Sequence, residues 1–250
     1  MVLENSLIGI EITMDRSLKR SIVIPCFNEK GNLEKLINTC LENLCTESIE
    51  VILVDNGSND GSEKIFSSLE TNDFLKSIRI NKNIGYGNGI LQGLKHATGD
   101  YIGWTHADLQ TDPKDVVRGF ELINDENTFV KGSRRGRRFG DNIFTIGMAI
   151  FETILLKTFL WEINAQPTIF HKSFFNNWVN PPNDFSLDLF VYFYAKKSNL
   201  KIKRLKVIFP DRFSGKSSWN TGIRSRISLV SRTVKFSYDL SKRVKAKNLH

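Results

Sequence analysis

Three polar side chains at alternating positions have the spacing of a site for a metal ion or a phosphate: His106, Asp108 and Gln110. In an extended chain alternate side chains point to the same side, so all three can face one ion. Oxygen ligands suit Mg²⁺ and Mn²⁺, and an imidazole suits Mn²⁺ less well than a carboxylate does. Three side chains so placed could hold a divalent metal ion, which the imidazole would bind more weakly than a carboxylate would. The alternative is that His106 only hydrogen-bonds a phosphate or the neighbouring loop.

The first half of the chain predicts alternating strands and helices around these residues. Apolar runs with the length of buried strands are Ser21–Pro25, Val51–Asp55, Ser77–Ile80, Tyr101–Thr105 and Phe129–Gly132. Helical spacing of apolar residues follows Asn32, covers Ser62–Leu69, follows Asn88 and covers Pro113–Asn124. Asn32 and Asn88 are the predicted N-caps of their helices. The alternation indicates an α/β fold, a mostly parallel sheet with helices on both faces.

Parallel sheets of this kind bind their ligands at the carboxyl ends of the strands. Polar residues follow three of the predicted strands, and they are Asn28, Glu29, Asp55, Asn56, His106, Asp108 and Gln110. Because the carboxyl ends of parallel strands meet at one edge of the sheet, we expect these side chains to form a common site.

The second half of the chain is less regular. Four arginines, Arg134, Arg135, Arg137 and Arg138, form a predicted basic loop. The further elements that we expect are helices at Asn142–Trp161 and Asp184–Ala195, a strand at Leu205–Phe209 and basic helical structure from Gly222. We therefore predict that the second half forms a less regular part of the same fold, beside the sheet of the first half.

The composition is that of a globular protein. The chain has 250 residues, of which 40% are hydrophobic and 25% are charged, and this excludes disordered and fibrous classes. The net charge of +8 is unevenly distributed, since residues 1–195 carry 19 basic and 25 acidic residues whereas residues 196–250 carry 16 and 2. We expect the basic end to contact an anionic membrane surface. No nucleic-acid recognition motif accompanies the charge, so we expect no nucleic-acid partner.

Cysteine usage and hydropathy predict a location for the chain. Its three cysteines are Cys26, Cys40 and Cys45. Their odd number and their spacing argue against a disulfide framework and for the reducing cytoplasm. The N-terminus lacks the basic start of a signal peptide, and the apolar stretch Ile143–Trp161 contains Glu152 and Lys157. We therefore expect a cytoplasmic protein that is peripheral on the inner face of the cell membrane.

Four segments, in their order along the chain, together resemble one known family: Pro25–Glu29, Val54–Gly61, Gly99–Tyr101 and His106–Gln110. They resemble the family 2 glycosyltransferases, which have the GT-A fold. The branch that they resemble most contains dolichol-phosphate mannosyltransferase and bacterial polyprenyl-phosphate sugar transferases. The resemblance implies a single domain over residues 21–220, with a nucleotide-binding half to about residue 125 and an acceptor half from about 126. Residues 1–20 would be an N-terminal extension and residues 221–250 a basic helical tail.

The same resemblance implies a donor-binding site. Its residues would be Pro25, Phe27, Glu29, Asp55, Gly85, Asp108 and Arg134. Phe27 would flank the base or ribose, Glu29 would accept ribose hydroxyl protons, and Asp55 would bind the base. A planar guanidinium at Arg134 suits a phosphate. Two alternatives are open: Phe27 packs in the core, and Asp55 only stabilises the turn that follows it.

The acceptor side and the catalytic groups are implied in the same way. Asn164, Gln166, Asp184 and Lys216 would bind the acceptor or a phosphate, and Asp108, Asp188 and Arg212 would be catalytic. Asp184 and Asp188 are four residues apart and share one face if their segment is helical. Asp188 is the expected general base for a hydroxyl acceptor. A polyprenyl phosphate is already an anion and would need no base.

The resemblance therefore implies an inverting glycosyltransferase that uses a UDP- or GDP-linked sugar and a Mg²⁺ or Mn²⁺ ion. His106, Asp108 and Gln110 would hold the ion, because they lie where the family has its acidic metal-binding motif. Its acceptor would be a polyprenyl phosphate or a glycan hydroxyl, in the synthesis of a cell-surface polysaccharide or glycolipid. The alternative is a non-catalytic nucleotide-sugar-binding protein of the same fold. The sequence evidence for that alternative is the imidazole of His106 at a position where the family has an acid.

Overall fold

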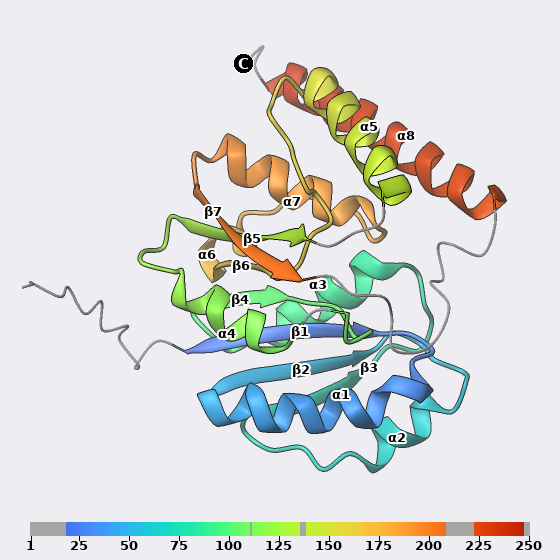
Figure 1. Ribbon diagram of the computed structural model, residues 1–250, viewed down its shortest axis with the longest axis vertical. Helices are drawn as coiled ribbons and strands as arrows, with labels where there is room; N and C mark the ends of the chain where they lie inside the picture. The colour runs from blue at the N-terminus through green and yellow to red at the C-terminus, as the bar shows by residue number, and fades with distance from the viewer. Residues whose placement is uncertain (1–18, 111, 136–138, 209–222, 248–250) are drawn as a thin grey trace, which may run out of the picture.

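The computed structural model describes residues 19–247, apart from residues 111, 136–138 and 209–222 (Figure 1). For residues 139–145, 223–229 and 244–247 only the backbone is described. Within these limits the structure is one sheet with the strand order β3-β2-β1-β4-β6-β5-β7. The strands are β1 Arg20–Cys26, β2 Ile49–Asp55, β3 Leu75–Arg79, β4 Tyr101–Trp104, β5 Thr128–Arg135, β6 Thr168–His171 and β7 Lys201–Ile208.

The sheet is mostly parallel. β1 pairs in parallel with β2 and β4, β2 with β3, and β5 with β7, whereas β6 is antiparallel to both β4 and β5. The predicted α/β fold with a mostly parallel sheet is therefore confirmed. In Figure 1 the carboxyl ends of β1, β2 and β5 lie on the right-hand side of the sheet.

Helices cover both faces of the sheet, as predicted. They are α1 Lys30–Asn43, α2 Ser62–Ser68, α3 Tyr86–His96, α4 Lys114–Glu121, α5 Phe139–Leu156, α6 Lys172–Asn176, α7 Ser186–Lys197 and α8 Ile223–Lys247, with a 3₁₀ turn at Cys45–Glu47. Successive side chains of a strand point to opposite faces. Ile22 and Ile24 of β1 accordingly join the core formed with α1 and α4, while Val23 joins the core formed with α3 and α7.

The predicted strands and helices all overlap observed elements, but some of their limits were wrong. Asn32 and Asn88 are not N-caps, because α1 and α3 are capped by Glu29 and Gly85. The Asn32 side chain instead donates to the Glu29 carboxylate at 2.7 Å from within the first turn. The helix α5 ends at Leu156 and not at Trp161, since the next residue has a positive φ of 49°.

The strand β6 and the short helix α6 were missed by the sequence analysis. Thr168–His171 is a four-residue strand that follows a proline, and so short a run carries little periodicity of its own. Its assignment comes from pairing on both sides, with β4 and with β5. The consequence is that the segment before β6 runs across the carboxyl side of the sheet, where the ligand site was predicted.

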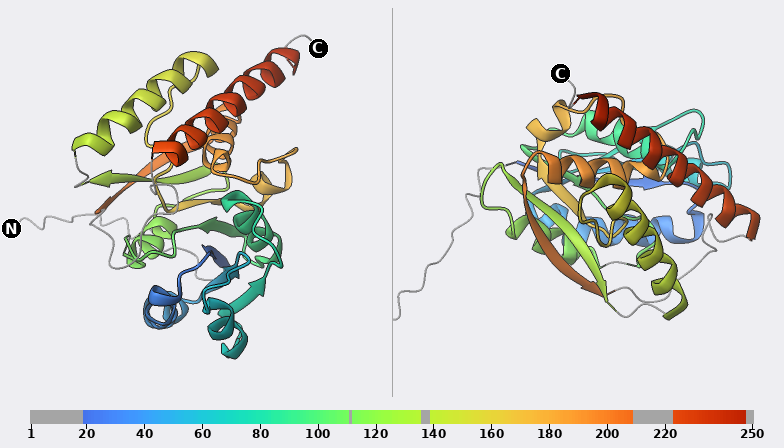
Figure 2. Two further views of the ribbon diagram at one scale, coloured as in Figure 1. Left: turned by 90° about the vertical axis from the view of Figure 1, so that its right-hand side faces the viewer. Right: turned by 90° about the horizontal axis from the view of Figure 1, so that it is seen from above.

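The helices α5 and α8 lie side by side at the top of the molecule (Figures 1 and 2). Leu240 of α8 is completely buried and belongs to the same core as α3 and α7, which anchors this layer to the domain. Among the described residues, no helix has the length and apolar character that crossing a membrane requires.

Candidate active site

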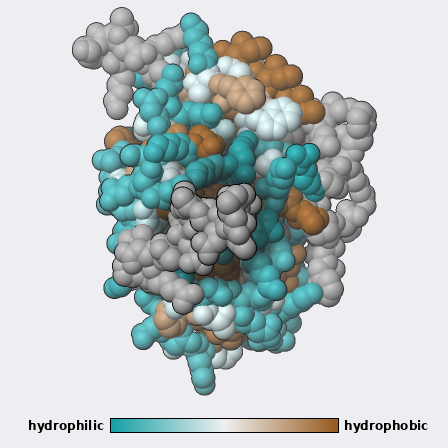
Figure 3. Space-filling model, turned by 60° about the vertical axis from the view of Figure 1, so that its left-hand side comes forward, coloured by the Kyte–Doolittle hydropathy of each residue, from teal (hydrophilic) through white to brown (hydrophobic). Residues whose placement is uncertain are grey.

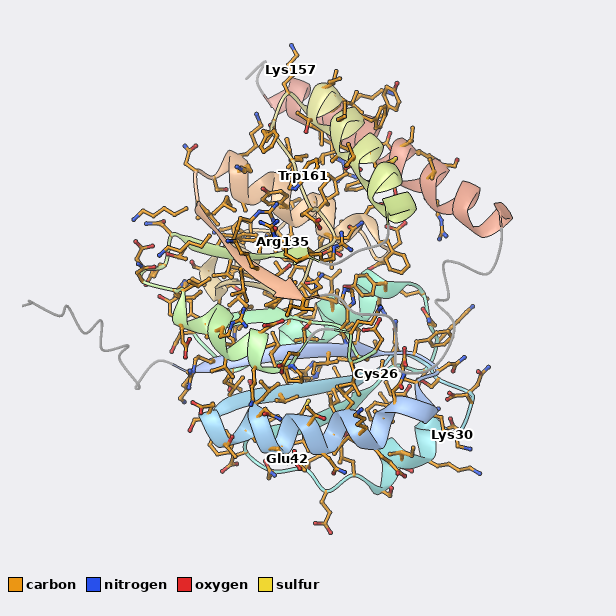
Figure 4. The ribbon with its side chains drawn as sticks, in the orientation of Figure 1. Cys26, Lys30, Glu42, Arg135, Lys157 and Trp161 are labelled. Atoms are coloured by element: carbon orange, nitrogen blue, oxygen red, sulfur yellow. The ribbon has the colours of Figure 1, made fainter. Side chains whose placement is uncertain are left out.

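The polar residues that were predicted at strand ends lie at the same edge of the sheet. Cys26 is paired with Asp55 in the register of β1 and β2, so the segments that follow both strands start next to each other. Figure 4 shows Cys26 and Lys30 at this edge, where the chain passes from β1 into α1. A hydrogen bond joins the two segments, because the Asn28 side chain accepts from the Asn59 backbone N–H at 3.0 Å.

Asp55 ends β2 and is completely buried. Its Oδ1 accepts from the Ser58 backbone N–H at 2.8 Å, and its Oδ2 lies 3.3 Å from the Arg79 guanidinium. The bond to Ser58 stabilises the turn, as the alternative interpretation required, but it leaves the other oxygen for a ligand beside Arg79. Phe27 is 38% exposed, so the alternative that it packs in the core is wrong.

The predicted donor-binding turn at Gly85 is held against the acceptor half of the chain. Gly85 has a φ of 140°, and a Cβ there would lie 2.2 Å from the Asn183 carbonyl oxygen. The Asn88 N–H donates to that carbonyl at 2.8 Å. The turn at the start of α3 and the loop before α7 therefore fit only because the residue is glycine.

The segment His106–Gln110 is a sequence of bends, so the predicted extended conformation was wrong. Leu109 has a positive φ of 55°, and the Gln110 N–H donates to Asp108 Oδ1 at 3.2 Å. Asp108 is buried, whereas His106 and Gln110 are half-buried. The bond from Gln110 fixes the Asp108 carboxylate within this turn, close to the end of β4.

Burial lowers the pKa of His106, and so do the charges of Arg134 and Lys131, although Asp108 and Asp188 oppose the shift. The imidazole is therefore neutral at pH 7 and can act as a nitrogen ligand. Within the described residues no group of three or more His, Cys, Asp or Glu side chains has the arrangement of a metal site. If a divalent cation binds here, His106, Asp108 and Gln110 would offer it one imidazole nitrogen and two kinds of oxygen, donor types that such ions accept.

Asp188 lies in the first turn of α7 and is enclosed by the sheet. Its Oδ1 is 3.1 Å from Lys131 Nζ of β5 and accepts from Gln166 Nε2 at 2.8 Å. The sequence analysis did not select Lys131. A lysine inside the apolar run that becomes β5 was the signal that could have identified it, because a buried ammonium needs a charged partner.

Arg134 also has a partner that the sequence analysis missed. Its Nε donates to Glu162 Oε2 at 2.8 Å, and both side chains are largely buried. Arg204 of β7 supports the same region by donating to the carbonyl oxygens of Gly132 and Trp161. Figure 4 shows Arg135 and Trp161 in this upper part of the molecule. The predicted phosphate-binding arginine is therefore attached to the segment that crosses from α5 to β6.

Two aromatic rings, also missed from the sequence, lie beside these groups. Tyr86 stacks on Phe185 with ring centroids 4.7 Å apart, and its ring is 6.3 Å from that of His106. Gln166 Nε2 is 3.4 Å from the Tyr86 hydroxyl. Burial raises the pKa of Tyr86, and the Asp188 charge raises it further. The hydroxyl is therefore a neutral donor and acceptor at the site.

The remaining predicted acceptor residues are dispersed. Gln166 is buried beside Asp188, whereas Asn164 is exposed. Asp184 precedes α7, and its Oδ1 accepts from the Ser186 N–H at 2.9 Å. The prediction that Asp184 shares a helical face with Asp188 was therefore wrong. The predicted residues Arg212 and Lys216 lie outside the described part of the chain, as do Arg137 and Arg138. Arg134 and Arg135, predicted in a loop, are instead the last two residues of β5.

Comparisons with known proteins define the class. A sequence model described as Glycosyl transferase family 2 matches residues 21–192, and the chain belongs to this family. A curated relative is the undecaprenyl-phosphate 4-deoxy-4-formamido-L-arabinose transferase of Enterobacter sp. (strain 638), which is 38% identical over 124 residues. That match covers 48% of this chain and 38% of the relative, so the chain accounts for well under half of the relative's length.

Solved structures agree with the predicted GT-A fold. Mannosyl-3-phosphoglycerate synthase from Rubrobacter xylanophilus has a TM-score of 0.68 at 18% identity, covering 94% of this chain and 76% of that one. Glucosyl-3-phosphoglycerate synthase from Mycobacterium tuberculosis, in complex with Mn²⁺ and UDP-glucose, has a TM-score of 0.66 at 17% identity, covering 89% and 79%. At such identities the similarity is one of fold.

Proposed function

We propose that this chain transfers a sugar from a UDP- or GDP-linked donor to a polyprenyl phosphate, with inversion at the anomeric carbon. The observation that carries the proposal is the meeting of opposite charges at one edge of the sheet. Asp108, Arg134 and Asp188 come from three separate parts of the chain, and all three charges act on His106. Such a site suits a diphosphate leaving group and the cation that accompanies it.

The donor would lie across the carboxyl ends of the strands. Asp55 and Phe27 would hold the nucleoside, and Arg134 would face the diphosphate with its guanidinium oriented by Glu162. His106, Asp108 and Gln110 would hold Mg²⁺ or Mn²⁺. The cation, when bound, neutralises the charge that develops on the leaving group. Support for a divalent ion comes from two fold relatives that were crystallised with Mn²⁺, one with UDP-glucose and one, from Pyrobaculum calidifontis, with GDP-mannose.

A phosphate acceptor fits the surroundings of Asp188. An oxygen of the phosphate forms the new bond to the anomeric carbon while the bond to the nucleoside diphosphate breaks, and no proton has to move. The expected general base, Asp188, is paired with Lys131 and does not stand free. The name of the undecaprenyl-phosphate transferase relative supports the same acceptor class.

A lipid acceptor also fits the surface formed by α5 and α8, which we call the α5–α8 face. Ile146, Ile150 and Ile154 are exposed along one side of α5 at four-residue intervals, and Ile154 is 72% exposed. Figure 3 shows hydrophobic side chains at the top of the molecule, where α5 and α8 lie. Among the side chains of α8 that the structure describes, the exposed basic ones are Arg232, Lys235, Lys242 and Arg243. We propose that this face binds the anionic inner leaflet of the cell membrane.

A donor screen tests the proposed reaction. The protein is incubated with UDP- and GDP-sugars and Mn²⁺, with and without undecaprenyl phosphate in detergent, and release of nucleoside diphosphate is measured. We expect release that requires both the lipid and the cation, and that EDTA abolishes. Transfer to a glycan hydroxyl without lipid would contradict the acceptor. Nucleotide-sugar binding without turnover on any acceptor would support the non-catalytic alternative.

A further inference from the structure

A lysine is completely buried within the sheet next to the proposed site. Lys131 Nζ, on β5, lies 3.1 Å from Asp188 Oδ1 and donates to Thr168 Oγ1 of β6 at 2.8 Å. It also lies 6.0 Å from the centre of the Trp104 ring. The ammonium is thus surrounded by one carboxylate, one hydroxyl and one aromatic face, all from different elements.

The same groups form a closed ring of hydrogen bonds. Thr168 Oγ1 donates to Gln166 Oε1 at 3.0 Å, and Gln166 Nε2 donates to Asp188 Oδ1 at 2.8 Å, where Lys131 also donates. Every polar group in the ring therefore has a partner. Such a ring restricts the Asp188 carboxylate to one orientation.

The orientation separates the two oxygens of Asp188. Lys131 and Gln166 both bond to Oδ1, and neither bonds to Oδ2. Both side chains are buried, since that of Asp188 is 2% exposed and that of Lys131 has no exposure. Gln166 Nε2 also lies 3.4 Å from the Tyr86 hydroxyl, and the Tyr86 ring is 6.3 Å from that of His106, so Asp188 adjoins the candidate site. Oδ2 is thus the oxygen left for the space where the donor would lie.

Stability alone is a weak reason for this ion pair. Removing two charges from water is costly, and apolar residues of similar volume often replace a buried pair without loss of stability. Burial lowers the pKa of Lys131 to about 8, although the neighbouring carboxylate opposes the shift, so the ammonium is still charged at pH 7. A carboxylate that receives bonds from an ammonium and an amide on one oxygen can still accept a hydrogen bond on the other.

We propose that Lys131 is a positioning residue: with Gln166 it holds Asp188 as a carboxylate that accepts a hydrogen bond from a hydroxyl of the donor sugar, instead of taking a proton from the acceptor. The inference rests on the proposed function, because it needs a nucleotide-sugar at this site. Lys131 would thus help to select the sugar indirectly. It bonds to Oδ1 of Asp188 and orients the carboxylate, while Oδ2 would bind the sugar.

Calorimetry with Mn²⁺ tests the proposal by comparing each nucleoside diphosphate with its sugar-linked form. The probes are UDP, GDP, UDP-glucose, GDP-mannose and further UDP- and GDP-sugars. The variants are Asp188→Asn, Lys131→Met and the double variant Lys131→Met/Asp188→Leu, with Lys206→Met on the exposed side of β7 as the control. The double variant removes both charges together, so it is expected to keep the melting temperature even if Lys131→Met alone does not fold.

We expect the wild-type protein to bind one sugar-linked probe more tightly than its nucleoside diphosphate. All three variants lose that preference, by about tenfold, while affinity for the nucleoside diphosphate changes less than twofold. If the double variant folds and keeps the preference for the sugar-linked probe, the Lys131–Asp188 pair is purely structural and the proposal is overturned. If Asp188→Asn kept its sugar-nucleotide affinity but lost kcat in the transfer assay, Asp188 would be a base, and this result would also overturn the proposal. No preference in the wild type would also overturn it, whereas failure to bind any nucleotide would contradict the proposed function itself.

Discussion

Arg134 Nε donates to Glu162 Oε2 at 2.8 Å, and this pair connects the end of β5 to the segment between α5 and β6. Both side chains are largely buried, so the guanidinium is held in place before any ligand binds. An arginine whose side chain is already ordered loses less entropy when it binds a phosphate. The pair therefore prepares the site for a diphosphate.

Replacing Arg134 should weaken binding of the diphosphate. Arg134→Ala is expected to lower the affinity for UDP or GDP by tenfold or more, or about 1.4 kcal/mol. Arg134→Lys should recover only part of the loss, because an ammonium cannot bind Glu162 and a phosphate with the planar geometry of a guanidinium. Calorimetric titration measures both. The matched control is Arg135→Ala at the neighbouring exposed arginine, where a loss as large as that of Arg134→Ala would contradict the assignment.

Changing His106 to an acid should strengthen the cation site. His106→Asp replaces a neutral imidazole by a carboxylate, and hard divalent ions prefer oxygen ligands. We expect the Mn²⁺ affinity, measured by electron paramagnetic resonance with UDP present, to rise by about tenfold. His96→Asp, at an exposed histidine on α3, should have no effect. Lower Mn²⁺ affinity in His106→Asp would show that residue 106 does not face the cation.

Two glycines should respond to alanine in opposite directions. Gly85→Ala combines a φ of 140° with a clash against the Asn183 carbonyl oxygen, so it should lower the free energy of unfolding by about 2 kcal/mol or more. Gly147→Ala in α5 meets no atom within 4 Å and should stabilise the protein by about 0.5–1 kcal/mol. Urea unfolding measures both changes. Equal effects of the two substitutions would contradict the close approach of Gly85 to the Asn183 carbonyl oxygen.

The carboxyl group of Glu152 should make stability fall as pH rises. Burial in the α5 layer raises the pKa of Glu152 to about 8 from 4.5. Between these values the unfolded chain is ionised while the folded one stays protonated, so stability is greatest below pH 4.5 and declines as pH rises through 8. Glu152→Gln should remove this decline, a gain on the order of 4 kcal/mol at pH 8 and above.

Urea unfolding at pH 5 and pH 8.5 checks the prediction for Glu152. The Glu152→Gln variant should resemble the wild type at pH 5 and exceed it at pH 8.5. Glu34→Gln, at an exposed position of α1, is the control and should leave both values unchanged. A stability gain of the same size at both pH values would instead indicate better packing.

The α5–α8 face should bind anionic vesicles. Ile150→Ser/Ile154→Ser removes apolar area from the exposed side of α5 and should lower binding to phosphatidylglycerol vesicles severalfold in a flotation assay. Binding by the wild type should also weaken with salt, because the basic residues of α8 contribute to it. Val179→Ser changes an exposed apolar residue outside α5 and α8, and an equal loss there would argue against this surface.

Much of the fold was predictable because it depends on local periodicity. The strand Val51–Asp55 is a run of apolar residues that ends in an acid, and this alone predicts a buried strand with a carboxylate at its end. β6 was not predictable in the same way, since its four residues are defined by pairing with β4 and β5. Asp184 was misassigned for a related reason: the helix α7 begins two residues later, and helix limits depend on backbone geometry that spacing does not encode.

The sequence by itself determined the α/β class, the alternation of strands and helices in the first half of the chain, and which acids end β2 and follow β4. Local residue patterns suffice for these features, because each is a property of one short segment. Only the tertiary structure decided the partners of the charged side chains. Lys131 and Asp188 are separated by 57 positions, and Arg134 and Glu162 by 28. Such pairs form because a buried charge must meet an opposite one, and which one it meets depends on how the sheet brings distant segments together.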